Sequence, residues 1–229
     1  MKIIFLDMDG VMNSLQSYYW YSNMLGHKED CWVDYKSSQN STFTGYETQL
    51  CPLACSNLKN ILDIYSDIKI VISSTWRKSR DFGWFNHLFK YFKIFEEDKV
   101  IGKTPILNLE RGYEIQHWLN NFEEDINDFV ILDDDGDMGP YCDTNHFIQT
   151  DGKVGFDYRK MEEVDKHFGG FNLSFEELKE KTPYLMYSKP RDILYYKTAE
   201  GMCYITEKGC LSNPAFFYKK SELFAEVKE

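Results

Sequence analysis

Three short apolar runs, each followed at once by polar residues, constrain the fold of this 229-residue chain more than any other feature. They are residues 2–6 (KIIFL), 68–72 (IKIVI) and 129–132 (FVIL). Runs this short and this apolar are typical of parallel strands that are buried on both faces of a sheet. We therefore expect three buried strands in the core of the protein.

Apolar residues at helical spacing lie between these runs. One predicted helix has a single apolar face made of Ile115, Trp118, Leu119 and Phe122. Another is opened by Pro52 and carries Leu53, Leu58, Ile61, Leu62 and Tyr65. The alternation of strand, helix and strand predicts an α/β fold with a doubly wound, mostly parallel sheet.

The rest of the chain divides into a core and two additions. Residues 1–168 form the predicted core, and residues 13–50, rich in Tyr, Trp, Ser and Asn, form an ordered insertion within it. After a Gly-Gly pair, residues 171–229 are predicted to form a small α+β appendage. Its features are a capping box at Ser174 and Glu177 and a hairpin over residues 192–206.

Composition excludes several classes of protein. No window approaches the roughly 18 uncharged apolar residues of a membrane helix. Acidic residues outnumber basic ones by 37 to 26, and the net charge of -11 disfavours a protein that coats long DNA. Six cysteines in a chain without an export signal indicate reduced thiols and a cytoplasmic protein.

The polar residues after the three runs predict a metal site. The first run ends in Asp7 and Asp9, the second in Ser73 and Ser74, and the third in an acidic stretch that begins at Asp133. In doubly wound sheets these strand ends meet, and clustered carboxylates repel one another unless a cation lies among them. Oxygen ligands without an adjacent His or Cys favour Mg²⁺, which also binds phosphate.

This arrangement suits phosphoryl transfer. One carboxylate near the metal can attack phosphorus, and a second, two residues on, can protonate the departing oxygen and then activate water. A hydroxyl after the second strand and one cationic side chain would hold the phosphoryl oxygens.

The segments FLDMDGVMN, VISSTWR and VILDDDGDM resemble the motifs of haloacid-dehalogenase-like (HAD) phosphatases. The stretches RGYEIQHWL and FIQTDGKVGF resemble a HAD subgroup associated with nucleic-acid repair proteins. The resemblance covers residues 1–168. It implies a lid at residues 13–50 and a Mg²⁺-dependent phosphatase that acts through an aspartyl-phosphate.

The resemblance also implies roles for single residues. Asp7 would be the nucleophile and Asp9 the general acid and base, with its backbone carbonyl reaching Mg²⁺. Ser73 would bind the phosphoryl group, with Ser74 as the competing choice. The remaining metal ligands would be Asp133, Asp134 and Asp137.

The cationic phosphate-binding residue has two candidates. Arg111 fits by its position ahead of GYEIQHWL, and Lys103 fits because the family mostly uses lysine there. Position favours Arg111. Arg77 is a third cation, which either grips the leaving group or is an exposed arginine at the start of a helix.

Two other patterns have structural as well as functional interpretations. His27, Cys31, Cys51 and Cys55 have spacings that would permit zinc, but their spacing departs from the usual zinc motif and favours ordinary buried thiols. The aromatic residues of the insertion are interpreted as the core of a flap, with base stacking as the alternative.

The leading hypothesis is a phosphatase acting on a nucleotide or a polynucleotide terminus. A receiver-like phosphoacceptor domain is disfavoured, because such domains pair adjacent acids after the first strand. A HAD scaffold that sequesters a nucleotide without hydrolysis is the other alternative, and the presence of both Asp7 and Asp9 disfavours it.

Overall fold

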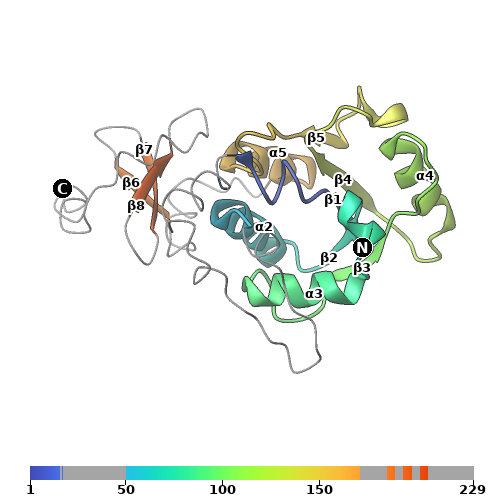
Figure 1. The fold of residues 1–229 in the computed structure, drawn as a ribbon, viewed down its shortest axis with the longest axis horizontal. Coiled ribbons are helices and arrows are strands. Elements are labelled where there is room, and N and C mark those ends of the chain that lie inside the picture. The colour runs from blue at the N-terminus through green and yellow to red at the C-terminus, as the bar shows by residue number, and fades with distance from the viewer. Residues whose placement is uncertain (16, 18–49, 171–184, 189–192, 198–201, 206–229) are drawn as a thin grey trace.

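A computed structural model describes residues 1–15, 17, 50–170, 185–188, 193–197 and 202–205 of the chain. Its centre is a five-stranded parallel sheet in the order β3-β2-β1-β4-β5 (Figure 1). The strands are β1 (Lys2–Leu6), β2 (Ile68–Ile72), β3 (Val100–Lys103), β4 (Asp128–Asp133) and β5 (Phe147–Gln149). The predicted doubly wound α/β fold is therefore confirmed.

Helices cover both faces of this sheet (Figure 1). One face packs against α2 (Pro52–Ile64), α3 (Phe82–Tyr91) and α5 (Tyr158–His167). The other face packs against α4 (Arg111–Asn121) and the short 3-10 helix η3 (Gly139–Tyr141). A second 3-10 helix, η2 (Thr75–Lys78), follows β2.

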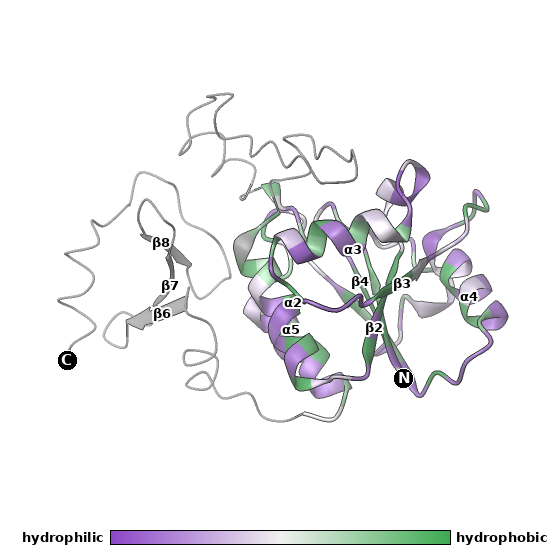
Figure 2. Ribbon diagram, turned by 90° about the horizontal axis from the view of Figure 1, so that it is seen from below, coloured by the Kyte–Doolittle hydropathy of each residue, from purple (hydrophilic) through white to green (hydrophobic). Residues whose placement is uncertain are grey.

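The sequence of β1 explains why it lies in the middle of the sheet. Ile4 and Leu6 are buried in the larger core on one face, and Ile3 and Phe5 are buried in the smaller core on the other. Apolar residues on both sides of a strand require cover on both sides. Figure 2 shows apolar residues on the central strands, whereas the helices around them carry both hydrophilic and apolar residues.

The register of the sheet places the three polar strand ends side by side. Leu6 pairs with Ile72 of β2 and with Leu132 of β4. The residues that come next in the chain are Asp7 after β1, Ser73 after β2 and Asp133 at the end of β4. These three residues therefore lie at one level at the carboxyl edge of the sheet. The backbone N–H of Asp7 donates to the Leu132 carbonyl at 2.9 Å, which fixes this level.

The C-terminal part contains a three-stranded antiparallel sheet of β6 (Leu185–Ser188), β7 (Ile193–Lys197) and β8 (Met202–Ile205). The pairing of β7 with β8 confirms the predicted hairpin. The predicted capping box at Ser174 and Glu177 lies outside the described residues, as does most of the predicted lid. Within the described ranges, no helix combines the length and apolarity needed to cross a membrane.

Candidate active site

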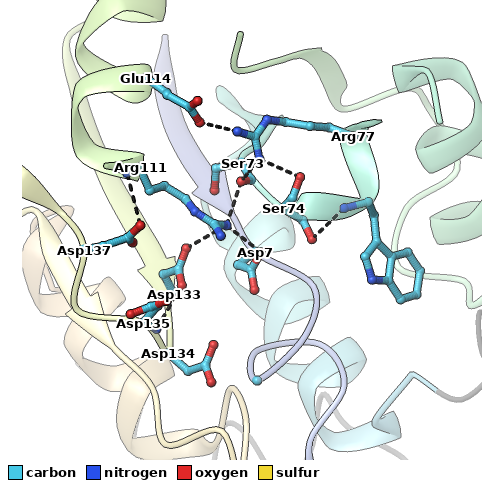
Figure 3. Close-up of polar contacts among 12 residues, drawn as sticks. Asp7, Ser73, Ser74, Arg77, Arg111, Glu114, Asp133, Asp134, Asp135 and Asp137 are labelled. Carbon is cyan, nitrogen blue, oxygen red and sulfur yellow. Dashed lines mark hydrogen bonds and ion pairs between the residues drawn. The ribbon is translucent and has the colours of Figure 1, made fainter. Parts of the chain in front are cut away.

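Three carboxylates converge at the carboxyl edge of the sheet (Figure 3). Oxygen atoms of Asp7, Asp133 and Asp134 all lie within 4.8 Å of one another. Asp7 follows β1, and the other two come from the end of β4 and the residue after it. Asp7 and Asp133 are buried and Asp134 is half-buried. These residues form one compact acidic group, as the strand ends predicted.

Arg111, the first residue of α4, lies against this group (Figure 3). Its Nη1 is 2.7 Å from Asp7 Oδ1 and 3.1 Å from Asp133 Oδ2, and it donates to the Ser73 carbonyl at 2.7 Å. The other candidate cation, Lys103, donates from Nζ to the backbone carbonyls of Arg77 and Arg80, at 2.8 Å each. The structure thus brings Arg111 to Asp7, whereas the described contacts of Lys103 are with backbone.

Burial opposes the ionisation of this carboxylate pair. Desolvation raises the pKa of Asp7, and the charge and hydrogen bond of Arg111 act against that rise. Desolvation and the neighbouring Asp7 charge raise the pKa of Asp133 well above its usual range, and Arg111 lowers it only in part. The site therefore has a deficit of positive charge that a bound cation would correct.

The start of α4 is fixed by the acidic loop after β4. The backbone N–H of Arg111 donates to Asp137 Oδ2 at 3.3 Å, and that of Gly112 donates to the Asp137 carbonyl at 3.2 Å. A Cβ on Gly112 would lie 1.8 Å from the Met138 carbonyl oxygen, so only glycine permits this approach. Asp137 was predicted to help bind the metal, but here it holds the helix that carries Arg111 and is not in the acidic group.

A tight turn after Asp7 makes room for the Asp134 side chain. Gly10 has φ +78°, and a Cβ there would lie 2.1 Å from Asp134 Cγ. The same turn carries Asp9, whose Oδ2 accepts a hydrogen bond from the Trp76 indole at 2.8 Å. The Asp9 carboxylate is not in the compact acidic group, although Asp9 lies on the same loop as Asp7.

The two serines after β2 differ in their relation to Asp7. While burial raises the pKa of Asp7, the Ser74 hydroxyl is among the groups that oppose the rise. The Ser73 hydroxyl is buried and has no hydrogen-bond partner, whereas the Ser73 carbonyl accepts from Arg111. Ser74, the second choice on sequence grounds, is therefore the serine whose hydroxyl lowers the pKa of Asp7 through a hydrogen bond.

Arg77 lies inside the protein rather than on its surface. Only 4% of it is exposed, so its interpretation as an exposed arginine at a helix start is wrong. Its Nη1 donates to the carbonyls of Ser73 at 2.6 Å and Ser74 at 2.8 Å, and its Nη2 forms a buried ion pair with Glu114 of α4. These contacts connect η2 to α4 and do not involve the acidic group.

Glu114 is a structural residue that sequence reasoning missed. It is buried, and its Oε1 accepts from the Leu107 backbone N–H at 2.8 Å while its Oε2 pairs with Arg77. Its position one residue before the apolar face of the predicted helix was the available signal. A charged residue so close to an apolar face is usually paired when it is buried.

Residues 3–161 match the model of a protein family described as the HAD domain in Swiss Army Knife RNA repair proteins. The chain belongs to this family. The match covers more than half of the chain and includes every residue of the site described above. No curated protein and no solved structure gives a significant match.

The acidic group of this HAD domain fits Mg²⁺. Asp133 Oδ2 is buried and makes no hydrogen bond of good geometry, despite lying 3.1 Å from Arg111 Nη1. Together with the carboxylates of Asp7 and Asp134, this oxygen forms a set of hard oxygen ligands of the kind that Mg²⁺ prefers. Asp7, Asp133 and Asp134 are therefore the residues that would hold the ion.

The cysteines of the HAD domain that the structure describes are not arranged as a zinc site. Cys51 and Cys55 are buried in the core around α2, and desolvation raises the pKa of both thiols. Their proposed partners Cys31 and His27 lie outside the described residues. Elsewhere, Asp128, His146 and His167 form a second group close enough to share a cation, in which His167 Nε2 lies 3.0 Å from Asp128 Oδ1.

Proposed function

We propose that this HAD domain is a Mg²⁺-dependent phosphatase that removes a terminal phosphate from a nucleotide or an RNA end. The observation that carries the proposal is the position of Asp7. Its carboxylate lies 2.7 Å from a cationic donor, Arg111 Nη1, and shares the site with Asp133 and Asp134. The site would thus combine a nucleophilic carboxylate, a phosphate-binding cation and a set of metal ligands.

In the proposed reaction, Asp7 attacks phosphorus and forms an aspartyl-phosphate, while Asp9 protonates the departing oxygen. Asp9 then removes a proton from water, which attacks the phosphorus and releases Asp7. Arg111 and the Ser74 hydroxyl would bind the phosphoryl oxygens. Bound Mg²⁺ would offset the negative charge that the carboxylates and the phosphate bring together.

The substrate class follows from the family and from charge. The family is described by its association with RNA repair proteins, which favours a polynucleotide terminus. The net charge of -11 favours recognition of a short end rather than a long stretch of backbone. The substrate we propose is therefore a terminal phosphomonoester on RNA, or the same phosphomonoester on a free nucleotide.

Phosphate release in the presence of Mg²⁺ tests the proposal. We would screen nucleoside monophosphates and oligoribonucleotides phosphorylated at the 5′ or the 3′ end. The Asp7→Asn variant should lose turnover of every substrate, because an amide cannot form the acyl-phosphate. Asp135→Asn removes the same charge from an exposed neighbour, so it should retain turnover and is the matched control.

Two outcomes would contradict the proposal. The first is undiminished turnover by Asp7→Asn, which would exclude the aspartyl-phosphate. The second is tight binding of a nucleotide that stays intact in the presence of Mg²⁺, measured by calorimetry. That result would indicate a domain that sequesters its ligand.

A further inference from the structure

Trp76 and Asp9 are 67 residues apart in the chain and form a direct hydrogen bond. The indole Nε1–H of Trp76 donates to Asp9 Oδ2 at 2.8 Å. Asn13 Nδ2 lies 3.5 Å from the other oxygen, Oδ1, at the outer limit of a hydrogen bond. The two oxygens of Asp9 therefore have different surroundings.

The short contact with Trp76 matters because an indole N–H only donates. It has no lone pair with which to accept a proton from a carboxylic acid. The oxygen that faces Trp76 must act as an acceptor, whether Asp9 is ionised or protonated. The bond therefore orients the whole carboxyl group through Oδ2, whichever of the two oxygens carries a proton.

Trp76 is also firmly placed. Its backbone N–H donates to Ser74 Oγ at 3.3 Å within η2, and the next residue is Arg77, whose buried ion pair with Glu114 ties η2 to α4. Its ring packs edge-on against Trp84, with 6.2 Å between centroids. A donor on such a turn can set the orientation of the carboxylate that it contacts.

We propose that Trp76 is a positioning residue for Asp9 in the phosphatase reaction, an inference that rests on the proposed function. In the first step a bond forms between Asp7 and phosphorus, and the bond from phosphorus to the leaving oxygen breaks. The proton on Asp9 moves to that oxygen, while Asp9 Oδ2 keeps its hydrogen bond from Trp76. In the second step the Asp9 carboxylate takes a proton from water, whose oxygen bonds to phosphorus as the bond between phosphorus and Asp7 breaks.

The test compares leaving groups. A ribose hydroxyl needs a proton to depart, whereas a nitrophenolate departs without one, so only the first should depend on correct placement of Asp9. Trp76→Phe keeps the aromatic ring and removes the N–H. It should lower kcat/KM for a phosphorylated oligoribonucleotide by roughly tenfold to a hundredfold, the effect of a hydrogen bond to a charged group.

For an activated aryl phosphate, kcat/KM of Trp76→Phe should stay within about threefold of wild type, because this leaving group departs without a proton. Trp118→Phe makes the same replacement at an indole in the smaller core on the other face of the sheet, and it should change kcat/KM for neither substrate. Equal losses on both substrates in Trp76→Phe would show a merely structural role and overturn the proposal.

A spectroscopic measurement does not depend on turnover. The chain has five tryptophans, and the indole N–H resonance of Trp76 is identified by its disappearance in Trp76→Phe. Asp9→Asn removes the charge of the acceptor, so this resonance should shift more than the other four. An unmoved resonance would overturn the proposal.

An inactive wild-type chain would contradict both the proposed function and this role of Trp76. An active wild-type chain with equal losses on both substrates in Trp76→Phe would contradict the role of Trp76 alone.

Discussion

Arg111 Nη1 lies 2.7 Å from Asp7 Oδ1 and 3.1 Å from Asp133 Oδ2, so one side chain from α4 contacts carboxylates at the ends of two different strands. Burial disfavours both charges, and the guanidinium partly compensates. A phosphate placed between Arg111 and Asp7 would take over the contact that Asp7 now makes. In the proposed reaction, Arg111 would therefore be in place to bind an anionic substrate.

The two candidate cations should differ in their effect on catalysis. Arg111→Ala should lower kcat by about 10²–10³, because it removes a preorganised donor aimed at the phosphoryl group. Lys103→Ala is the matched comparison, since the Lys103 amine contacts the carbonyls of Arg77 and Arg80 instead. Steady-state kinetics decide between them. A larger loss in Lys103→Ala would assign the phosphate contact to the lysine.

The serines after β2 offer a second discrimination. Ser74→Ala should reduce kcat/KM by roughly tenfold, the effect of about one hydrogen bond to a charged group, because its hydroxyl acts on the Asp7 carboxylate. Ser73→Ala should have little effect, since its hydroxyl makes no hydrogen bond in the structure. The reverse order would restore Ser73 as the phosphate-binding hydroxyl.

The ion pair between Arg77 and Glu114 should be important for stability. Glu114→Ala leaves the buried Arg77 charge without its carboxylate and should cost about 3–5 kcal/mol of unfolding free energy. Chemical denaturation measures this, with Glu123→Ala at an exposed position as the control. The double variant Arg77→Met/Glu114→Met should lose less than Glu114→Ala, because it leaves no unpaired charge. A double variant as unstable as the single one would contradict this account.

Metal and pH should act together on stability. The pKa values of Asp7 and Asp133 are raised in the folded protein, chiefly by burial, so above pH 4 the folded state binds more protons than the unfolded state. Their contribution to stability is therefore present at low pH and is lost as the pH rises through the raised values. Mg²⁺ should reverse that loss.

Thermal unfolding measures this linkage. At pH 8, Mg²⁺ at a hundred times its Kd should raise Tm by roughly 5–10 °C, and the increase at pH 5 should be smaller because protons compete with the metal. The Asp133→Asn variant should respond less at pH 8. An equal increase at both pH values, or an unchanged response in Asp133→Asn, would place the metal elsewhere.

The close approach of α4 to the acidic loop should depend on glycine. Gly112→Ala would place a Cβ 1.8 Å from the Met138 carbonyl oxygen and should cost about 1–3 kcal/mol of unfolding free energy. It should also lower kcat, since the shift moves Arg111. Gly136→Ala is the control, because its nearest neighbour would be a side-chain nitrogen 3.9 Å away. Wild-type stability in Gly112→Ala would show that the helix start adjusts freely.

The core of the fold was predictable because its elements are encoded locally. The apolar runs at 2–6 and 68–72 match β1 and β2 residue for residue, and Pro52 begins α2. The run at 129–132 lies within β4. The strands β3 and β5 have few residues and weaker apolar character, and the sequence pattern did not separate them from loops.

The candidate residues of the site were predictable for the same reason, since polar residues directly after buried strands must meet at one sheet edge. The contacts of each residue were not predictable, because they depend on which side chains face one another in the folded protein. The sequence alone determined an α/β sheet with carboxylates at its carboxyl edge. Only the tertiary structure decided that Arg111 contacts Asp7, that Asp137 holds α4, and that Trp76 contacts Asp9. Those contacts join residues 67 or 104 positions apart, or a helix start to a loop, and no local pattern encodes such distances.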